Sequence, residues 1–176
     1  YSFCETATAS DIRNLSAQGT NWNGRATDGS TIFMWAATYT SSAEVIESLV
    51  EGGADVYATD STGQTAFFYA ASYSYYPEVI TALVRAGSYT EARDNEGYTA
   101  FMWAGESNTI PEVIHALAEA GANINATTEN GWTPLMAAAA FNYPEAVRAF
   151  IQAGADINAK SKSDVTPLLQ AMSYNS

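Results

Sequence analysis

The chain has 176 residues, of which 47% are hydrophobic, and so we expect a single folded domain with a substantial core. Its net charge of −12, with 7 Lys and Arg residues and no basic stripe, argues against nucleic acid as a partner. No apolar run approaches the length of a membrane span, and so we expect no membrane insertion.

The polar residues are mostly uncharged. Lys160 and Lys162 are the two lysines, whereas there are 16 serines, 18 threonines and 11 tyrosines. This composition leans weakly towards a secreted protein over a cytoplasmic one, and it leaves the compartment open. The single cysteine, Cys4, excludes an intramolecular disulfide. Because the chain begins with Tyr1 rather than methionine, we expect that a leader has been removed or that the chain has been shortened.

The first predicted element is a partial helical unit at residues 1–25. Residues 1–4 align with the second half of a first helix, and a second helix follows around Ile12 and Leu15. Four full units follow at about 26–59, 60–93, 94–127 and 128–160, with a second partial unit at 161–176.

Two markers keep one register through these units. The first is a glycine that recurs every 33 or 34 residues, and the second is a threonine twelve residues after each glycine. The glycines are Gly19, Gly53, Gly87, Gly121 and Gly154, and the threonines are Thr31, Thr65, Thr99, Thr133 and Thr166. A constant period of this length predicts a repeat protein whose units stack into a solenoid.

Each unit has the signals of two short helices. Pro77 and Glu78 predict a helix start, and the apolar residues that follow have helical spacing. Gly87 predicts the end of that helix. After a turn, Thr99 predicts the cap of the next helix.

The turn and helix motifs resemble those of a known family. DSTGQT at 60–65 and DNEGYT at 94–99 match its turn, TPLM at 133–136 its helix start, and GADINA at 154–159 the segment before the next turn. Over essentially the whole chain the pattern resembles the ankyrin repeat, in bacterial-type units of 33 or 34 residues. The resemblance implies one all-α solenoid domain of helix–turn–helix units joined by β-hairpin-like turns.

The chain departs from the family at one position of each unit. Where ankyrin repeats usually have a histidine, this sequence has an apolar residue, and we expect packing in place of a polar link between repeats. The positions are Met34, Phe68, Met102 and Met136.

The ends of the solenoid allow two interpretations. A shortened chain or a disordered tail explains them, and so does head-to-tail stacking, in which the last helix packs on the first unit of another copy and builds a filament. The residues predicted for self-association are Tyr1, Phe3, Ile12, Leu168, Leu169 and Met172.

The sequence offers no arrangement typical of catalysis. His115 is the single histidine, at a position of a predicted helix where a polar residue is expected, and a solvent-facing role explains it best. One histidine and one cysteine exclude a zinc motif. We therefore predict no catalytic residues, no metal and no cofactor.

The family resemblance implies a protein partner that lies across the turns and the exposed side of the first helices. Equivalent first-helix positions hold Trp35, Tyr69 and Trp103, and the turns contribute Gln64, Tyr98 and Trp132. Aromatic residues with a polar end are enriched at interfaces, although packing between neighbouring helices explains the same ladder.

A second cluster lies in a predicted loop between two helices and consists of Tyr73, Tyr75 and Tyr76. Clustered tyrosines are typical of contact surfaces, and ordinary loop packing is the alternative. The sequence thus predicts a non-enzymatic protein-binding module or scaffold. The alternative function is a structural subunit that stacks into a filament, which we would expect outside the cell.

Overall fold

A computed structural model describes residues 2–141 and 143–173, with the side chains of Ser2 and Phe3 outside that description. The described residues form eleven helices and no sheet. The helices are α1 (Ser2–Thr6), α2 (Ala9–Ala17), α3 (Ile32–Tyr39), α4 (Ala43–Glu51), α5 (Ala66–Tyr73), α6 (Pro77–Arg85), α7 (Ala100–Ser107), α8 (Pro111–Glu119), α9 (Pro134–Ala140), α10 (Pro144–Gln152) and α11 (Pro167–Ser173).

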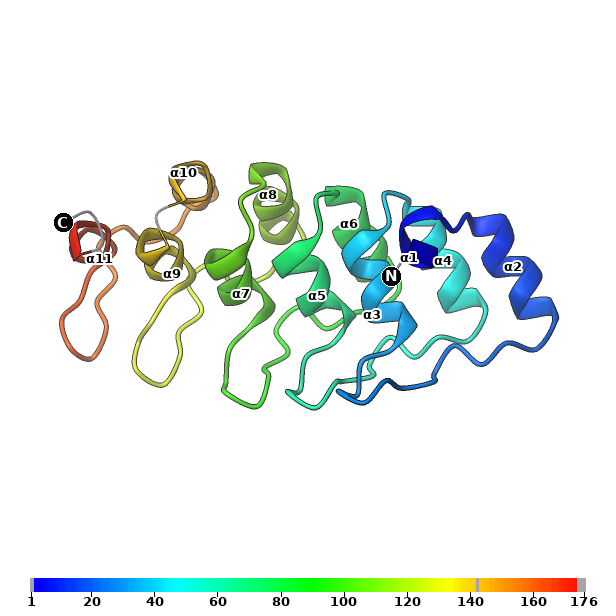
Figure 1. Cartoon of the computed structure of the whole chain (residues 1–176). Coiled ribbons are helices and arrows are strands. Elements are labelled where there is room, and N and C mark those ends of the chain that lie inside the picture. Colours follow the sequence, from blue (N-terminus) through cyan, green and yellow to red (C-terminus); the bar gives the residue numbers. More distant parts are fainter. Residues whose placement is uncertain (1, 142, 174–176) are drawn as a thin grey trace.

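The helices form two parallel rows. The odd-numbered helices are the first helices of their units, and each contacts the next one, as α3 contacts α5 and α5 contacts α7. The even-numbered helices form the second row in the same way. The long loops between units project to one side, with α2 at one end of the molecule and α11 at the other (Figure 1). The all-α solenoid predicted from the sequence is confirmed.

The first helices begin at the threonines of the repeat. The Thr99 hydroxyl accepts a hydrogen bond from the Met102 amide at 3.4 Å, and Thr133 accepts one from Met136 at 3.2 Å. These bonds satisfy amides that have no partner inside the helix. Thr65 has the same extended backbone but makes no side-chain cap bond.

The second helices begin at proline in three units and end at glycine. Pro77, Pro111 and Pro144 each occupy the first turn, as predicted for Pro77. Gly87, at φ +94°, follows the end of α6, and its amide bonds to the Val84 carbonyl while the Ser88 amide bonds to Leu83. This pair of bonds is the Schellman arrangement that a left-handed glycine permits.

The turns between units are held by aspartate side chains. Asp94 accepts hydrogen bonds from the amides of Glu96 and Tyr98 at 3.0 and 2.9 Å. Bridges between Arg25 and Thr31 and between Arg93 and Thr99 close two of these turns. The turns therefore have the β-hairpin-like form that the sequence predicts, and they place Gln64 and Tyr98 beside the first helices.

The core lies between the two rows. The four residues that replace the family histidine are completely buried there, as we expected from their apolar side chains: Met34, Phe68, Met102 and Met136. None of the described helices combines the length and the apolar character that a membrane span requires.

Candidate functional site

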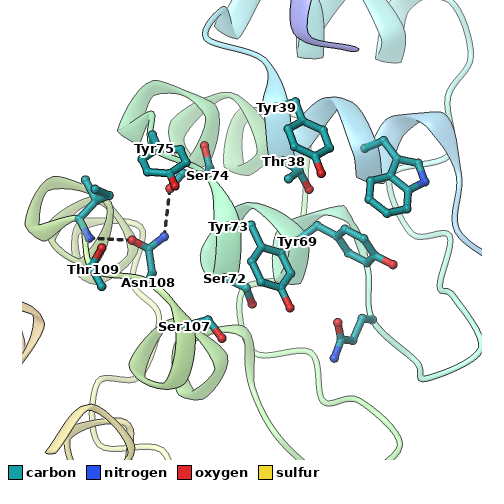
Figure 2. A pocket seen from close by; sticks show the side chains of 13 residues that line it. Thr38, Tyr39, Tyr69, Ser72, Tyr73, Ser74, Tyr75, Ser107, Asn108 and Thr109 are labelled. Atoms are coloured by element: carbon teal, nitrogen blue, oxygen red, sulfur yellow. Dashed lines mark hydrogen bonds between the residues drawn. The ribbon is translucent and has the colours of Figure 1, made fainter. Parts of the chain in front are cut away.

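A cleft of about 560 Å³ opens over α3, α5 and α7 and over the loops that follow α5 and α7 (Figure 2). None of its lining residues is charged. We call it the tyrosine cleft, and it is lined by Trp35, Thr38, Tyr39, Gln64, Tyr69, Ser72, Tyr73, Ser74, Tyr75, Ser107, Asn108, Thr109 and Ile110.

Aromatic rings from two neighbouring repeats form one wall of this cleft. The ring centroids of Trp35 and Tyr69 lie 5.7 Å apart, edge to face, and Tyr39 stacks on Trp35 at 6.1 Å. Tyr73 and Tyr75 are 51% and 68% exposed. The inner rings are already packed on one another. A partner that contacts the exposed outer tyrosines would therefore not have to order the whole wall on binding.

The inner rings are fixed by hydrogen bonds to the turns. The Trp35 indole donates to the Ser30 hydroxyl at 3.0 Å, and that hydroxyl donates to Asp28 at 2.6 Å. The Tyr69 hydroxyl donates to Asp60 at 3.0 Å. Burial and the carboxylate of Asp60 raise the pKa of Tyr69 well above its ordinary value, and so the phenol stays neutral and keeps its proton as a donor.

The floor of the cleft is held by a buried amide. Asn108 donates from Nδ2 to the carbonyls of Ala71 and Ser74 at 2.9 and 3.0 Å, and its Oδ1 accepts from the Ile110 amide at 2.8 Å. Figure 2 shows Asn108 between the loop that holds Ser74 and the loop that holds Thr109. This side chain fixes the position of one repeat against the next.

A pair of aromatic rings with acidic neighbours lies next to the cleft, one repeat further along the chain. The centroids of Tyr98 and Trp103 lie 5.7 Å apart, and the Trp103 indole donates to Asp94 at 2.7 Å. Glu106 lies on the same helix as Trp103, one residue before the cleft residue Ser107. Burial, together with the negative charges of Glu96 and Asp94, raises the pKa of Glu106 above its usual range.

The comparison with known families fits this architecture. The family model described as ankyrin repeats matches three times, at residues 6–94, 33–128 and 71–161. The chain belongs to the ankyrin-repeat family. Ankyrin-repeat proteins are typically non-enzymatic and generally mediate contacts between proteins. A search of curated proteins found no matching sequence.

In this ankyrin-repeat chain the predicted contact residues fall into two groups and two separate positions. Trp35, Gln64, Tyr69, Tyr73 and Tyr75 meet in the tyrosine cleft. Tyr98 and Trp103 form the adjoining pair. Trp132 lies in the turn before α9 and Tyr76 precedes α6, both outside the cleft lining.

The sequence analysis missed the polar residues of the cleft and the carboxylate beside it. Thr38, Ser72 and Glu106 occupy equivalent positions of three successive repeats, three residues after the ladder aromatics. The repeat register could therefore have identified these three positions from the sequence. The hydrogen bonds of Asn108 could not be predicted in this way, because they depend on how closely two repeats stack.

The residues predicted for self-association differ in how exposed they are. Leu168, Leu169 and Met172 on α11 are 69%, 51% and 64% exposed. Beside α11 lies a second cleft, of about 500 Å³, whose lining includes Ile151 and Leu168. Ile12, by contrast, is 1% exposed in the core and offers no surface to another copy. Tyr1 and the side chain of Phe3 lie outside the described residues.

The single histidine and the acidic residues show no shared site in the described part of the chain. His115 is half-buried on α8. Within residues 2–141 and 143–173, no three His, Cys, Asp or Glu side chains gather as a metal would require.

Proposed function

We propose that this chain is a non-enzymatic binding module that takes a protein partner in the tyrosine cleft. The observation that carries the proposal is the gathering of five aromatic rings from two repeats in one uncharged, hydroxyl-rich cleft. Tyrosine and tryptophan bury a large area and lose little conformational entropy, and so they dominate binding energy at protein interfaces.

The surface beside the cleft suits an extended partner. Tyr98 and Trp103 continue the aromatic surface onto the next repeat, and Gln64 extends it towards the turns. Packed helices lie about 8–10 Å apart, and so an extended segment of about ten residues, roughly 33 Å long, could cross three or four first helices. We propose Trp132 and Tyr76 as outer contacts of the same partner.

Stacking of copies into a filament has weaker support. The apolar residues of α11 favour it, because exposed apolar side chains often mark an interface. The opposite end of the molecule does not match them. Asp11 of α2 is exposed and charged, whereas the equivalent residues Val45, Val79 and Val113 are buried. An apolar face stacked on Asp11 would have to desolvate a carboxylate.

Selection of peptides from a random 12-residue phage library tests the proposal. Peptides selected on the wild-type chain should lose most of their affinity for a Tyr73→Ser and Tyr75→Ser double variant. The matched control is Tyr57→Ser with Tyr89→Ser, because Tyr57 and Tyr89 are 67% and 66% exposed but lie outside the cleft lining. Equal loss in both variants, or no loss in either, contradicts binding in the cleft.

A further inference from the structure

We infer, building on the proposed protein-binding role, that the partner is an extended segment with a lysine or arginine that binds between Tyr98, Trp103 and Glu106. Trp103 and Glu106 lie on α7 and Tyr98 lies in the turn before it, and Glu106 directly precedes the cleft residue Ser107. The cleft itself is uncharged, and so the cationic side chain would set the register of the segment along it.

Glu106 is unusual for its position in the repeat. The equivalent residues of the two preceding repeats, Thr38 and Ser72, line the cleft as neutral hydroxyls. The next repeat has Ala140 there. A carboxylate is therefore not required by the fold at this place.

The surroundings of Glu106 make its charge unfavourable in the free protein. It is partly buried, and Glu96 and Asp94 add two further negative charges, so that its pKa is raised. The ion pairs found within the described residues lie elsewhere and join Arg85 to Glu47, Arg148 to Glu145 and Lys160 to Asp164.

The nearest arginine in the sequence is engaged with the backbone. The Arg93 guanidinium donates to the carbonyls of Gly97 and Thr127, the latter at 3.3 Å. Among the described residues, no hydrogen bond or ion pair of the Glu106 side chain is present. A cation supplied by a partner would relieve the repulsion that this carboxylate causes.

Trp103 lies three residues before Glu106 on α7, and burial together with the nearby Glu106 charge raises the pKa of Tyr98. The two rings thus complete a site for a cation. Tyr98 and Trp103 are tilted by 45° to each other, and the bond from the Trp103 indole to Asp94 fixes the larger ring. A guanidinium or ammonium group is attracted to the face of tryptophan or tyrosine, and it forms a charge-assisted hydrogen bond to a carboxylate. The net charge of −12 would also speed the approach of a basic segment.

The test uses the peptides selected on the wild-type chain, remeasured by fluorescence anisotropy against Glu106→Gln. We expect the peptides to carry a lysine or arginine, and their Kd to rise about tenfold for this variant. The control is Glu119→Gln, which makes the same charge change at an exposed position on α8 in the other row of helices and should leave Kd unchanged. A peptide with the cation replaced by glutamine should bind wild type and Glu106→Gln equally.

The outcomes separate this inference from the proposed function. If the peptides lose affinity for the Tyr73→Ser and Tyr75→Ser variant but bind Glu106→Gln as well as wild type, the cleft binds protein and the cation site is refuted. If Glu119→Gln weakens binding as much as Glu106→Gln, the effect is one of net charge and the site is again refuted. If no selected peptide responds to the tyrosine variant, the proposed function fails and the inference with it.

Discussion

At the scale of single residues, polar groups beneath the rings give the tyrosine cleft its shape. Asn108 is the clearest case, because three hydrogen bonds from one buried amide connect the end of α5, the loop after it and the start of α8. The hydroxyls of the equivalent Thr40 and Ser74 bond only within their own loops, to the backbone of Ser42 and Tyr76. The longer side chain at position 108 therefore adds a link between repeats.

Replacement of the Asn108 side chain should lower the stability of the chain. Asn108→Ala leaves two buried carbonyls and one amide without their partner, which we expect to lower the free energy of unfolding by about 2–3 kcal/mol. Urea unfolding followed by circular dichroism measures this change. Asn108→Asp keeps the acceptor for Ile110 but loses both donors, so it should be destabilised as well; an unchanged midpoint for both variants contradicts the role assigned to Asn108.

Glu106 should affect stability in the opposite direction. Its raised pKa means that the folded chain binds its proton more tightly than the unfolded chain, so ionisation at neutral pH costs stability and protonation restores it. Glu106→Gln should raise Tm by about 2 °C at pH 7, a modest value because the group is only partly buried.

The pH dependence distinguishes this cause from a general effect of the substitution. The difference in Tm between Glu106→Gln and wild type should shrink as pH falls through the raised pKa, and it should vanish below the ordinary glutamate pKa of 4.5. Differential scanning fluorimetry from pH 4 to 8 measures it. A difference that is constant over this range contradicts the electrostatic explanation.

At the scale of helices, close contacts between first helices bring the rings of neighbouring repeats together. Gly105 of α7 has no room for a side chain, because a Cβ there would lie 2.4 Å from the carbonyl oxygen of Pro134 at the start of α9. The equivalent residues Ala37, Ala71 and Ala139 each carry the methyl group that position 105 excludes.

Gly105→Ala should therefore destabilise the chain, although alanine favours a helix by about 1 kcal/mol over glycine. Overpacking against a backbone atom costs about 1–3 kcal/mol, which outweighs that gain. The measurement is again urea unfolding. Gly24→Ala serves as the control, since a Cβ there meets no atom within 4 Å. Greater stability of Gly105→Ala would show that α7 and α9 are less closely packed than described.

The sequence predicted the elements well because their signals are local. Thr99, Pro77 and Gly87 each act on backbone groups within a few residues, and the repeat multiplied these signals. The composition of the cleft was only partly predictable. Tyr73 and Tyr75 stood out in the sequence, but their proximity to Trp35 depends on the stacking of α3 on α5, which no local signal encodes.

At the scale of the whole molecule, the two ends differ in polarity. One end has the charged Asp11, and the other has the exposed Leu168, Leu169 and Met172. Because these surfaces do not match, we predict that the purified chain is a monomer of 18.8 kDa. Light scattering coupled to size exclusion, over a range of protein concentrations, measures the mass. Rods or a mass that grows with concentration would favour the filament in place of the binding module.

The charge of the whole molecule also bears on the kind of partner that we expect. Uncharged rings line the cleft, the carboxylates of Asp60 and Glu106 lie next to it, and the whole chain is acidic. Such a surface would attract a basic segment and then hold it by aromatic contacts. Charge would act mainly on the rate of association, and the rings on the lifetime of the complex.

Photocrosslinking from inside the cleft tests whether the tyrosine cleft is the binding surface. A benzophenone amino acid at position 75 is compared with one at position 57, since Tyr75 and Tyr57 are 68% and 67% exposed and only Tyr75 lines the cleft. In an extract of the cells from which the protein comes, we predict a discrete crosslinked protein at position 75, absent at position 57 and lost on Tyr73→Ser. Equal crosslinking at the two positions, or none at position 75, would contradict the claim that the tyrosine cleft is the binding surface.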